Sequence, residues 1–240
     1  MKKKNQWKVS VVLPSYNDSE NIIEVLERLS QCLGENLYEI LVVDDNSPDE
    51  TWKIVKDLKN KKYKVIRRIH EKGLASALRR GVTEVQGNIV AWLDCDLGIP
   101  PEIVAELVEN LRDYDVAIGS RFIPGGGDPR SFPLPILSSW LNIYARMLFG
   151  TRITDYTSGV VAVRKAVLNQ VLWEDSGFGE YSAEFSYRCI KNNVRIVEIP
   201  LQYQIRKSGV SKLSGGSSWV FLKYGIQYGL KMLKWRLTIK

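Results

Sequence analysis

The sequence predicts an α/β fold, in which a mostly parallel β-sheet carries helices on both faces. Three observations lead to this prediction. Short apolar runs of strand length alternate with longer segments whose apolar residues recur at helical spacing. Several of the apolar runs end in acidic or turn-forming residues. No internal repeat, and no linker rich enough to separate two domains, interrupts the 240 residues.

Each expected strand is a run of β-branched and other apolar residues bounded by turn signals. Pro14 stops the first run, and Pro200 divides the last run into two strands. The alternation with helices is regular up to about residue 119 and weaker beyond it. The predicted strands are Val9–Leu13, Glu39–Val43, Lys64–Arg68, Ile89–Leu93, Asp115–Gly119, Val160–Val163 and Arg195–Ile205.

The expected helices begin at capping residues or prolines. Ser19 is the predicted cap of the first helix, and Asp49 begins the second. Pro100 and Pro101 open the fourth helix, because the first helical turn tolerates proline. The remaining predicted helices are Gly73–Val85, about 137–148, about 183–191 and 219–237.

The net charge of +7 is concentrated at the carboxyl end. Residues 211–240 contain six basic residues and no acid, which leaves 28 basic against 27 acidic residues before them. We therefore expect a local anionic partner for the tail and no nucleic-acid binding. The three cysteines are widely spaced, so a reducing compartment is expected, and the basic N-terminus does not resemble a signal peptide.

Two aspartates stand at the point where a buried strand is expected to end. Asp94 and Asp96 follow the apolar run Asn88–Trp92, with Cys95 between them. Ligands of open α/β sheets bind at the carboxyl ends of the strands. An Asp-x-Asp pair at that edge can hold Mg²⁺ or Mn²⁺, and the cation can hold a diphosphate. The alternative is a pair of solvated loop acids.

A second acidic pair and a basic loop lie near the same expected edge. Asp44 and Asp45 end another apolar run, although they are also suited to cap the helix that begins near Asp49. Lys72 and Gly73 precede a helix N-terminus, a position that favours anions.

Four basic residues are candidates for phosphate binding. Arg121 follows a buried strand beside a glycine-rich loop, and Arg206 ends another strand, so both suit bidentate contacts to phosphate. Arg130 and Lys212 complete this set, with solvated surface charge as the alternative for Arg130. His70, the single histidine, is expected to be a loop residue rather than a base.

Several short motifs follow one another in a fixed order along nearly the whole chain. They are P-S-Y-N-D at 14–18, V-D-D-N-S-P-D-E-T at 43–51, K-G-L-A-S-A at 72–77, L-D-C-D-L at 93–97, Pro100-Pro101, G-S-R-F at 119–122, G-G-G at 125–127, D-Y-T-S-G at 155–159, V-E-I-P at 197–200 and G-V-S-K-L at 209–213. Any one of them is weak, but their order and spacing together resemble those of family 2 glycosyltransferases. The branch that the chain most resembles is that of the dolichyl-phosphate mannosyltransferases and related polyprenyl-phosphate glycosyltransferases.

The resemblance implies a GT-A, Rossmann-like fold and a role for each matched residue. Asp45, with Asp44, would contact the base or ribose of a nucleotide-sugar. Many relatives carry a glutamine metal ligand where this chain has Gly98. Thr157, Ser158 and Glu184 lie in family-like stretches that would touch the sugar or the acceptor. Pro14, Tyr16 and Asp18 would form the other wall of the nucleotide pocket. Cys95 would also contact the nucleotide-sugar. The acceptor phosphate would be bound by Ser158, Arg130, Arg206 and Lys212.

The expected reaction is inverting, metal-dependent transfer of a hexose to a dolichyl or polyprenyl phosphate. A phosphate monoester is already anionic near neutral pH, because its second pKa is about 6, so it needs cations more than a base. Asp96, Arg121 and Arg206 are the predicted catalytic residues. We expect mannose from GDP-mannose as donor, with a UDP-sugar such as UDP-glucose, or a non-catalytic nucleotide-sugar-binding subunit, as the alternatives.

The tail reads as an amphipathic helix beyond a catalytic domain at 1–213. Within 214–240, Lys223, Gln227, Lys231 and Lys234 share one helical face, and aromatic and aliphatic residues cover the rest. Such a helix is a poor transmembrane span and favours the membrane interface, with lysines near anionic lipid. Docking on the protein core or on a small membrane subunit is the alternative. The expected location is peripheral, at the cytoplasmic face of a membrane.

Overall fold

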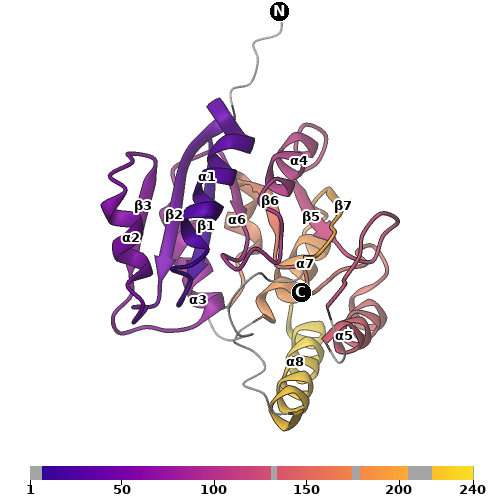
Figure 1. The fold of residues 1–240 in the computed structure, drawn as a ribbon. Helices are drawn as coiled ribbons and strands as arrows, with labels where there is room; N and C mark the ends of the chain where they lie inside the picture. The colour runs from indigo at the N-terminus through magenta and orange to yellow at the C-terminus, as the bar shows by residue number, and fades with distance from the viewer. Residues whose placement is uncertain (1–6, 131–133, 175–178, 205–217, 240) are drawn as a thin grey trace, which may run out of the picture.

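A seven-stranded mixed sheet runs through the protein (Figure 1). The computed structural model describes residues 7–130, 134–174, 179–204 and 218–239. The strand order is β3-β2-β1-β4-β6-β5-β7, and β6 is antiparallel to β4 and β5 while the other pairs are parallel. The predicted fold class is confirmed. The strands are β1 Val9–Ser15, β2 Leu37–Asp44, β3 Tyr63–Arg67, β4 Ile89–Trp92, β5 Val116–Ser120, β6 Val161–Arg164 and β7 Ile196–Pro200.

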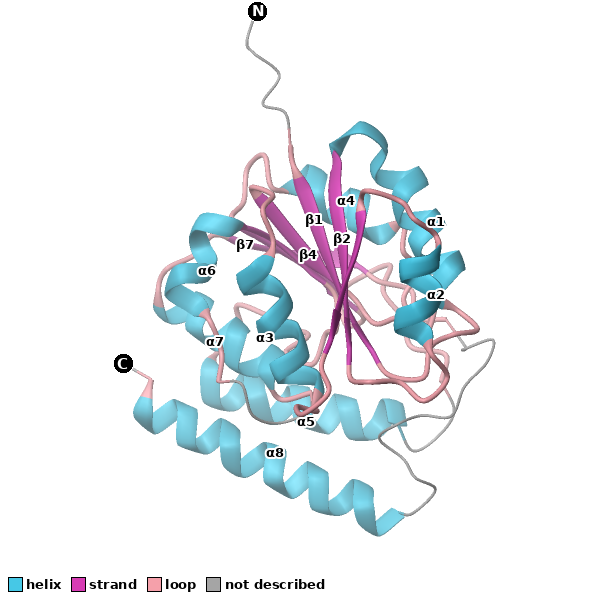
Figure 2. Ribbon diagram, turned by 90° about the vertical axis from the view of Figure 1, so that its left-hand side faces the viewer, coloured by secondary structure: helices cyan, strands magenta, loops and turns pink. Residues whose placement is uncertain are grey.

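Helices cover both faces of the sheet (Figure 2). Alternate residues of β1 point to opposite faces: Val11 and Leu13 pack in the cluster under α1, α2 and α4, and Val12 packs in the cluster under α3, α6 and α7. The site edge is therefore held between two separate apolar cores. The helices are α1 Ile22–Leu33, η1 Gly34–Asn36, α2 Thr51–Asp57, α3 Leu74–Glu84, α4 Ile103–Asn110, α5 Leu134–Phe149, α6 Lys165–Val171, α7 Tyr181–Lys191 and α8 Ser218–Thr238.

The first strand continues through Pro14 instead of stopping before it. Pro14 pairs with Val43 of β2, whereas the pairing of β1 with β4 ends at Val12. Proline is tolerated in a strand where no neighbour needs its missing N–H. The Pro14 carbonyl instead accepts a hydrogen bond from the Cys95 thiol at 3.5 Å. The strand thus carries its last residues past the sheet and into the site.

The predicted helix starts are shifted. Ser19 is not the cap of α1, which begins at Ile22; the Asp18 carbonyl accepts the N–H of Ile22 at 2.9 Å. Asp49 lies two residues before α2, and its Oδ1 accepts the N–H of Thr51 at 3.1 Å. The cap position of α2 is Glu50, which makes no side-chain capping hydrogen bond. Asp49 therefore holds the turn before α2, and neither Ser19 nor Asp49 is the cap of its helix.

The second half departs most from the prediction. The run 195–205 gives only β7, and beyond it residues 201–204 make one isolated bridge, between Gly127 and Gln202. The helix α6, Lys165–Val171, was not predicted; it follows β6 directly, without a glycine, a proline or a side-chain cap to mark its start. Local signals are weak here, because β6 enters the sheet between β4 and β5 by long-range pairing.

The C-terminal helix α8 lies beside α5 at the end of the molecule below the sheet (Figures 1 and 2). Met232 and Trp235 are buried against the core, so α8 is docked on the protein. Lys231 pairs with Glu180 at 3.2 Å, and Lys234 lies 3.8 Å from Glu174. These two lysines, predicted to face anionic lipid, are therefore engaged by the protein. The predicted domain boundary at 213/214 falls outside the described residues.

None of the helices that the structure describes is both long enough and apolar enough to cross a membrane.

Candidate active site

A cavity of about 890 Å³ lies where β1, β2 and β4 end. This is the edge at which open α/β sheets bind ligands. Most of the predicted site residues meet there. Asp44 does not line the cavity, and Arg206 and Lys212 lie outside the described residues. The predicted residues that line it are Pro14, Tyr16, Asp18, Asp45, Lys72, Gly73, Asp94, Cys95, Asp96, Arg121, Arg130 and Ser158.

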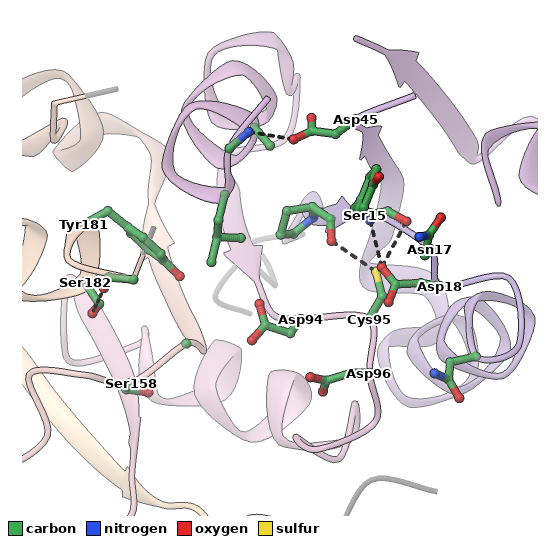
Figure 3. A pocket seen from close by; sticks show the side chains of 18 of the residues that line it. Ser15, Asn17, Asp18, Asp45, Asp94, Cys95, Asp96, Ser158, Tyr181 and Ser182 are labelled. Carbon is green, nitrogen blue, oxygen red and sulfur yellow. Dashed lines mark hydrogen bonds between the residues drawn. The ribbon is translucent and has the colours of Figure 1, made fainter. Parts of the chain in front are cut away.

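The two aspartates that follow β4 point into this cavity (Figure 3). Asp94 and Asp96 are half-buried, whereas Cys95 between them is buried and turns its thiol to the Pro14 carbonyl. Asp96 Oδ1 accepts the N–H of Gly98 at 2.8 Å, which fixes one end of its carboxylate. Successive side chains after β4 therefore point to opposite sides, so that the carboxylates of Asp94 and Asp96 both face the cavity while the Cys95 thiol is directed at Pro14.

This pair fits a hard divalent cation that shares its ligands with a substrate. Carboxylate oxygens are the ligands that Mg²⁺ and Mn²⁺ prefer. Among the described residues, no group of three or more His, Cys, Asp or Glu side chains is arranged to hold a metal. Mg²⁺ commonly uses one or two carboxylates and takes its other ligands from phosphates and water. Asp94 and Asp96 would hold the cation, and a diphosphate would complete its shell.

Gly98 is coupled to Tyr203. A Cβ at position 98 would lie 2.8 Å from Tyr203 Cε1 and 3.0 Å from Asp96 Oδ1. The carbonyl of Gly98 accepts the N–H of Gln204 at 2.8 Å. A larger residue at position 98 would therefore require the Tyr203 ring to shift.

Asp45 is held in the cavity wall by a buried arginine that the sequence analysis did not single out. Arg68 Nε donates to Asp45 Oδ1 at 2.6 Å, and the N–H of Gly73 donates to Asp45 Oδ2 at 2.7 Å (Figure 3). Arg68 also donates to the Gly73 carbonyl at 2.9 Å. Its place at the end of the predicted strand 64–68, beside the strand that leads to Asp45, was the available signal. This network fixes Asp45 against the loop before α3.

Asp44 lies behind the cavity wall. Its carboxylate is fully buried and accepts the backbone N–H of Ser47 at 2.8 Å and the Ser47 hydroxyl at 2.6 Å. Burial raises the pKa of Asp44, although the Ser47 hydrogen bonds oppose this. The placement makes Asp44 a residue that holds the turn after β2. It neither caps α2, whose cap position is Glu50, nor faces the cavity.

The turn after β1 forms the neighbouring wall. Asp18 Oδ2 accepts the N–H of Tyr16 at 2.9 Å and lies 3.2 Å from the Ser15 hydroxyl (Figure 3). Asn17 between them has a left-handed φ of 57°. The ammonium of Lys72 lies 5.5 Å from the ring centre of Tyr16 across the cavity wall. Tyr16 thus lines the cavity rather than the core.

Arg121 is buried and its guanidinium is largely occupied by Asp155. Nε and Nη2 of Arg121 donate to the two oxygens of Asp155, each at 2.8 Å, and Nη2 also contacts the Thr157 hydroxyl at 2.6 Å. Burial would lower the pKa of Arg121, but the charge and hydrogen bonds of Asp155 raise it above its usual value. The bidentate fork predicted to bind phosphate is directed at a carboxylate. Nη1 lies 3.4 Å from Asp128, and Arg121 is one of the residues that line the cavity.

Arg130 shares Asp128 with Arg121. It donates to Asp128 Oδ1 from Nε at 2.7 Å, and its guanidinium carbon lies 4.4 Å from the ring centre of Tyr203. Burial alone would raise the pKa of Asp128, but the hydrogen bonds and charge of Arg130, with Arg121, lower it. Arg130 is less buried than Arg121 and lines the cavity, so it is the more available of the two cations.

Other family-like residues separate into two groups. Ser158 and Thr157 line the cavity. Glu184 does not: it is buried in α7, where it accepts the N–H of Glu174 at 3.1 Å and pairs with Arg188. His70 is exposed and does not line the cavity.

Tyr181, Ser182 and Tyr203 are among the cavity residues that the sequence did not indicate. Tyr181 and Ser182 come from the first turn of α7, and Tyr203 follows β7. Figure 3 shows Tyr181 and Ser182 across from Asp45, with Asp94 between the two sides. Burial raises the pKa of Tyr181 well above its usual value, and the nearby Asp94 charge raises it further, so its phenol stays protonated.

The chain matches one family model over residues 10–172, described as glycosyl transferase family 2. It is 36% identical over 242 residues to the dolichol-phosphate mannosyltransferase of Pyrococcus furiosus, covering 95% of this chain and 64% of that protein's length. It is 33% identical to the polyprenol monophosphomannose synthase of Mycolicibacterium smegmatis, covering 86% of this chain and 81% of the relative. The dolichol-phosphate mannosyltransferase of Saccharomyces cerevisiae is 32% identical, with the same two coverages.

The fold is similar to that of glucosyl-3-phosphoglycerate synthase from Mycobacterium tuberculosis, solved with Mn²⁺, UDP and glucosyl-3-phosphoglycerate. The TM-score is 0.72 at 18% identity, over 96% of this chain and 80% of that one. At this identity the likeness shows the fold alone.

Proposed function

The chain belongs to glycosyl transferase family 2, and on that premise we propose that it transfers mannose from GDP-mannose to a dolichyl or polyprenyl phosphate with inversion. One observation carries the proposal. A single cavity joins the paired carboxylates of Asp94 and Asp96 to a wall of cationic side chains that includes Arg130. The first suits the diphosphate of a donor, and the second suits a phosphate acceptor.

The donor is proposed to lie along the cavity from Asp45 to Asp94. Asp45, fixed by Arg68 and Gly73, is placed to accept hydrogen bonds from the ribose or base. Lys72 adds positive charge beside Tyr16. A cation held by Asp94 and Asp96 would neutralise charge on the departing nucleoside diphosphate. The sugar then lies toward Tyr181, Ser158 and Ser182 (Figure 3).

The acceptor is proposed to be anionic because the cavity offers cations and no histidine. A phosphate oxygen needs no general base, since the second pKa of a phosphate monoester is about 6. We propose that Arg130 binds that phosphate, which would then replace Asp128 as the hydrogen-bond partner of its guanidinium. Arg206 and Lys212 remain predicted partners. Attack of the phosphate oxygen on the anomeric carbon from the side opposite the diphosphate gives the inverted product.

A donor panel tests this function. Incubation with labelled GDP-mannose, a polyprenyl phosphate and Mg²⁺ or Mn²⁺ is expected to move label into organic solvent, and EDTA is expected to stop the transfer. UDP-glucose and other UDP-sugars are the comparison donors, because base and sugar contacts set donor choice. Faster transfer from a UDP-sugar would replace the donor in the proposal. Absence of transfer from every donor, with nucleoside diphosphate still bound, would favour a non-catalytic subunit.

We also propose that the protein works at a membrane surface, through α5 and α8. Four large apolar side chains, spaced i, i+4, i+7 and i+11, are exposed along each of these two neighbouring helices. Apolar patches of this kind mark interaction surfaces, and an interfacial helix buries such a face in lipid. Proximity of a lipid acceptor favours a lipid surface as the partner. The exposed residues are Ile136, Trp140, Ile143 and Met147 on α5, and Ile226, Leu230, Leu233 and Leu237 on α8.

None of the three cysteines, all of which are described, forms a disulfide, which supports the proposed location at the cytoplasmic face.

Replacing Leu230 and Leu233 with glutamate is expected to weaken vesicle binding by at least about tenfold, since burying each leucine is worth about 1.5–3 kcal/mol. The measurement is co-sedimentation with vesicles that contain anionic lipid. Leu58→Glu, at an exposed leucine beyond α2, is the matched control. Point changes are preferable to deleting α8, because deletion also removes Met232 and Trp235 from the core. Unchanged binding by the double variant would favour a protein subunit as the partner.

A further inference from the structure

The side chain of Tyr228, on α8, reaches the wall of the cavity. The hydroxyl of Tyr228 lies 3.3 Å from the Gly179 carbonyl and 3.5 Å from the Ser182 hydroxyl. Gly179 and Ser182 both line the cavity, whereas Tyr228 does not. Tyr228 therefore touches the residues that form the wall from behind.

The hydroxyls of Ser182 and Tyr228 connect this turn to two other elements. Ser182 has one proton and two carbonyls within reach, that of Gly179 at 2.9 Å and that of Tyr156 at 3.0 Å. Burial raises the pKa of Tyr228, so its hydroxyl stays a donor. The Gly179 carbonyl has two lone pairs and can accept from Tyr228 as well as from Ser182. Hydrogen bonds therefore hold the turn to α8 and to the segment before β6.

The same turn has an ion pair with α8, because Lys231 pairs with Glu180 at 3.2 Å. Tyr181, between Glu180 and Ser182, points across the cavity toward Asp94 (Figure 3). A shift of this turn would move Tyr181 and Ser182 relative to the paired aspartates.

We propose that Tyr228 is a positioning residue, which fixes the turn Gly179–Ser182 and thereby the part of the cavity that receives the sugar and the acceptor. The helix α8, whose exposed apolar residues are proposed to face the membrane, then also sets the shape of the site. The role in transfer rests on the proposed function. Asp45, which is proposed to contact the nucleoside, lies apart from Tyr181 and Ser182 in the cavity (Figure 3) and is held by Arg68 and Gly73 instead.

Tyr228→Phe removes only the hydroxyl and tests this role in the full chain. Loss of one hydrogen bond is expected to lower kcat/KM for transfer about three- to tenfold. The affinity for the nucleoside diphosphate, measured by calorimetry, is expected to change less than about twofold, since the lost contact lies away from Asp45. The matched control is Tyr187→Phe, a buried tyrosine of α7 that stacks on Phe149 and does not line the cavity.

Hydrogen exchange gives a second measurement that does not need activity. The amides of Ala183 and Glu184 donate to the Glu180 carbonyl, at 3.1 and 3.2 Å. Their exchange is expected to be faster in Tyr228→Phe and unchanged in Tyr187→Phe. Equal exchange and equal turnover in the two variants would overturn the inference. If the unchanged protein shows no transfer with any donor, the proposed function fails, but faster exchange in Tyr228→Phe still supports the positioning role.

Discussion

Asp96→Asn is expected to lower sugar transfer by about 100- to 1000-fold while the protein stays folded. The substitution removes one of the two charges that would hold a divalent cation, and metal stabilisation of a leaving group is worth several kcal/mol. The asparagine oxygen still accepts the N–H of Gly98, so the local backbone keeps its hydrogen bond. Initial rates with labelled donor, at a series of Mg²⁺ and Mn²⁺ concentrations, measure the effect.

The metal series makes this result specific to Asp96. The variant is expected to need more metal for half-maximal rate than the unchanged protein, because one ligand is weaker. Asp113→Asn removes an exposed carboxylate outside the cavity and is the control for charge alone. Transfer by Asp96→Asn at the normal rate, with the normal metal requirement, would refute the assignment of the cation to this pair.

Asp155→Asn is expected to reduce the free energy of unfolding by about 3–5 kcal/mol. The change leaves Arg121 buried with one remaining carboxylate, Asp128 at 3.4 Å, and an unpaired buried charge is costly. For a chain of this size the melting temperature should fall by roughly 10 °C. Urea unfolding followed by tryptophan fluorescence measures the first quantity, and calorimetry measures the second.

A double variant separates stability from function at this pair. Adding Arg121→Met to Asp155→Asn removes the unpaired charge, and replacing buried ion pairs with apolar groups is often neutral or stabilising. The double variant should therefore be more stable than Asp155→Asn alone. Its transfer activity should nevertheless be low, because the cavity loses the positive charge of Arg121, which lines it. If Asp155→Asn lowers the free energy of unfolding by less than about 1 kcal/mol, the role given to the buried pair of Arg121 and Asp155 is contradicted.

The carboxyl-end placement of the acidic pairs could be predicted because it depends on local pattern. The run that becomes β4 is apolar at every position, so it must be buried, and Asp94 and Asp96 must leave the sheet where it ends. Because successive side chains of an extended segment point to opposite sides, the Asp96 carboxylate faces the cavity and the Cys95 thiol is directed to the other side. The same logic places Asp45 at the end of β2. In each case the controlling contacts lie within a few residues along the chain.

The roles of Arg121 and Asp44 could not be predicted, since their partners are set by packing. Arg121 sits at the end of a buried strand in the sequence, which favours a phosphate contact, but its carboxylate partner is 34 residues away. Asp44 and Asp45 are neighbours with the same chemistry, and only the arrangement of Ser47 and Arg68 around them decides which one faces the cavity.

The C-terminal helix also combines properties that the sequence determines with contacts that only the tertiary structure determines. Its helical spacing and its mixture of lysine and large apolar residues are properties of the sequence. Which face packs on the core, which lysines pair with Glu174 and Glu180, and how Tyr228 meets Gly179 depend on α5 and α7.

The sequence by itself therefore determined the fold class, the strands of the first half and the acidic edge of the site, because strand and helix periods and burial are local and repeated many times. Only the tertiary structure decided the antiparallel insertion of β6, the pairing of Arg121 with Asp155 and the docking of α8. These depend on single contacts between distant segments, and such contacts leave no periodic signal in the chain.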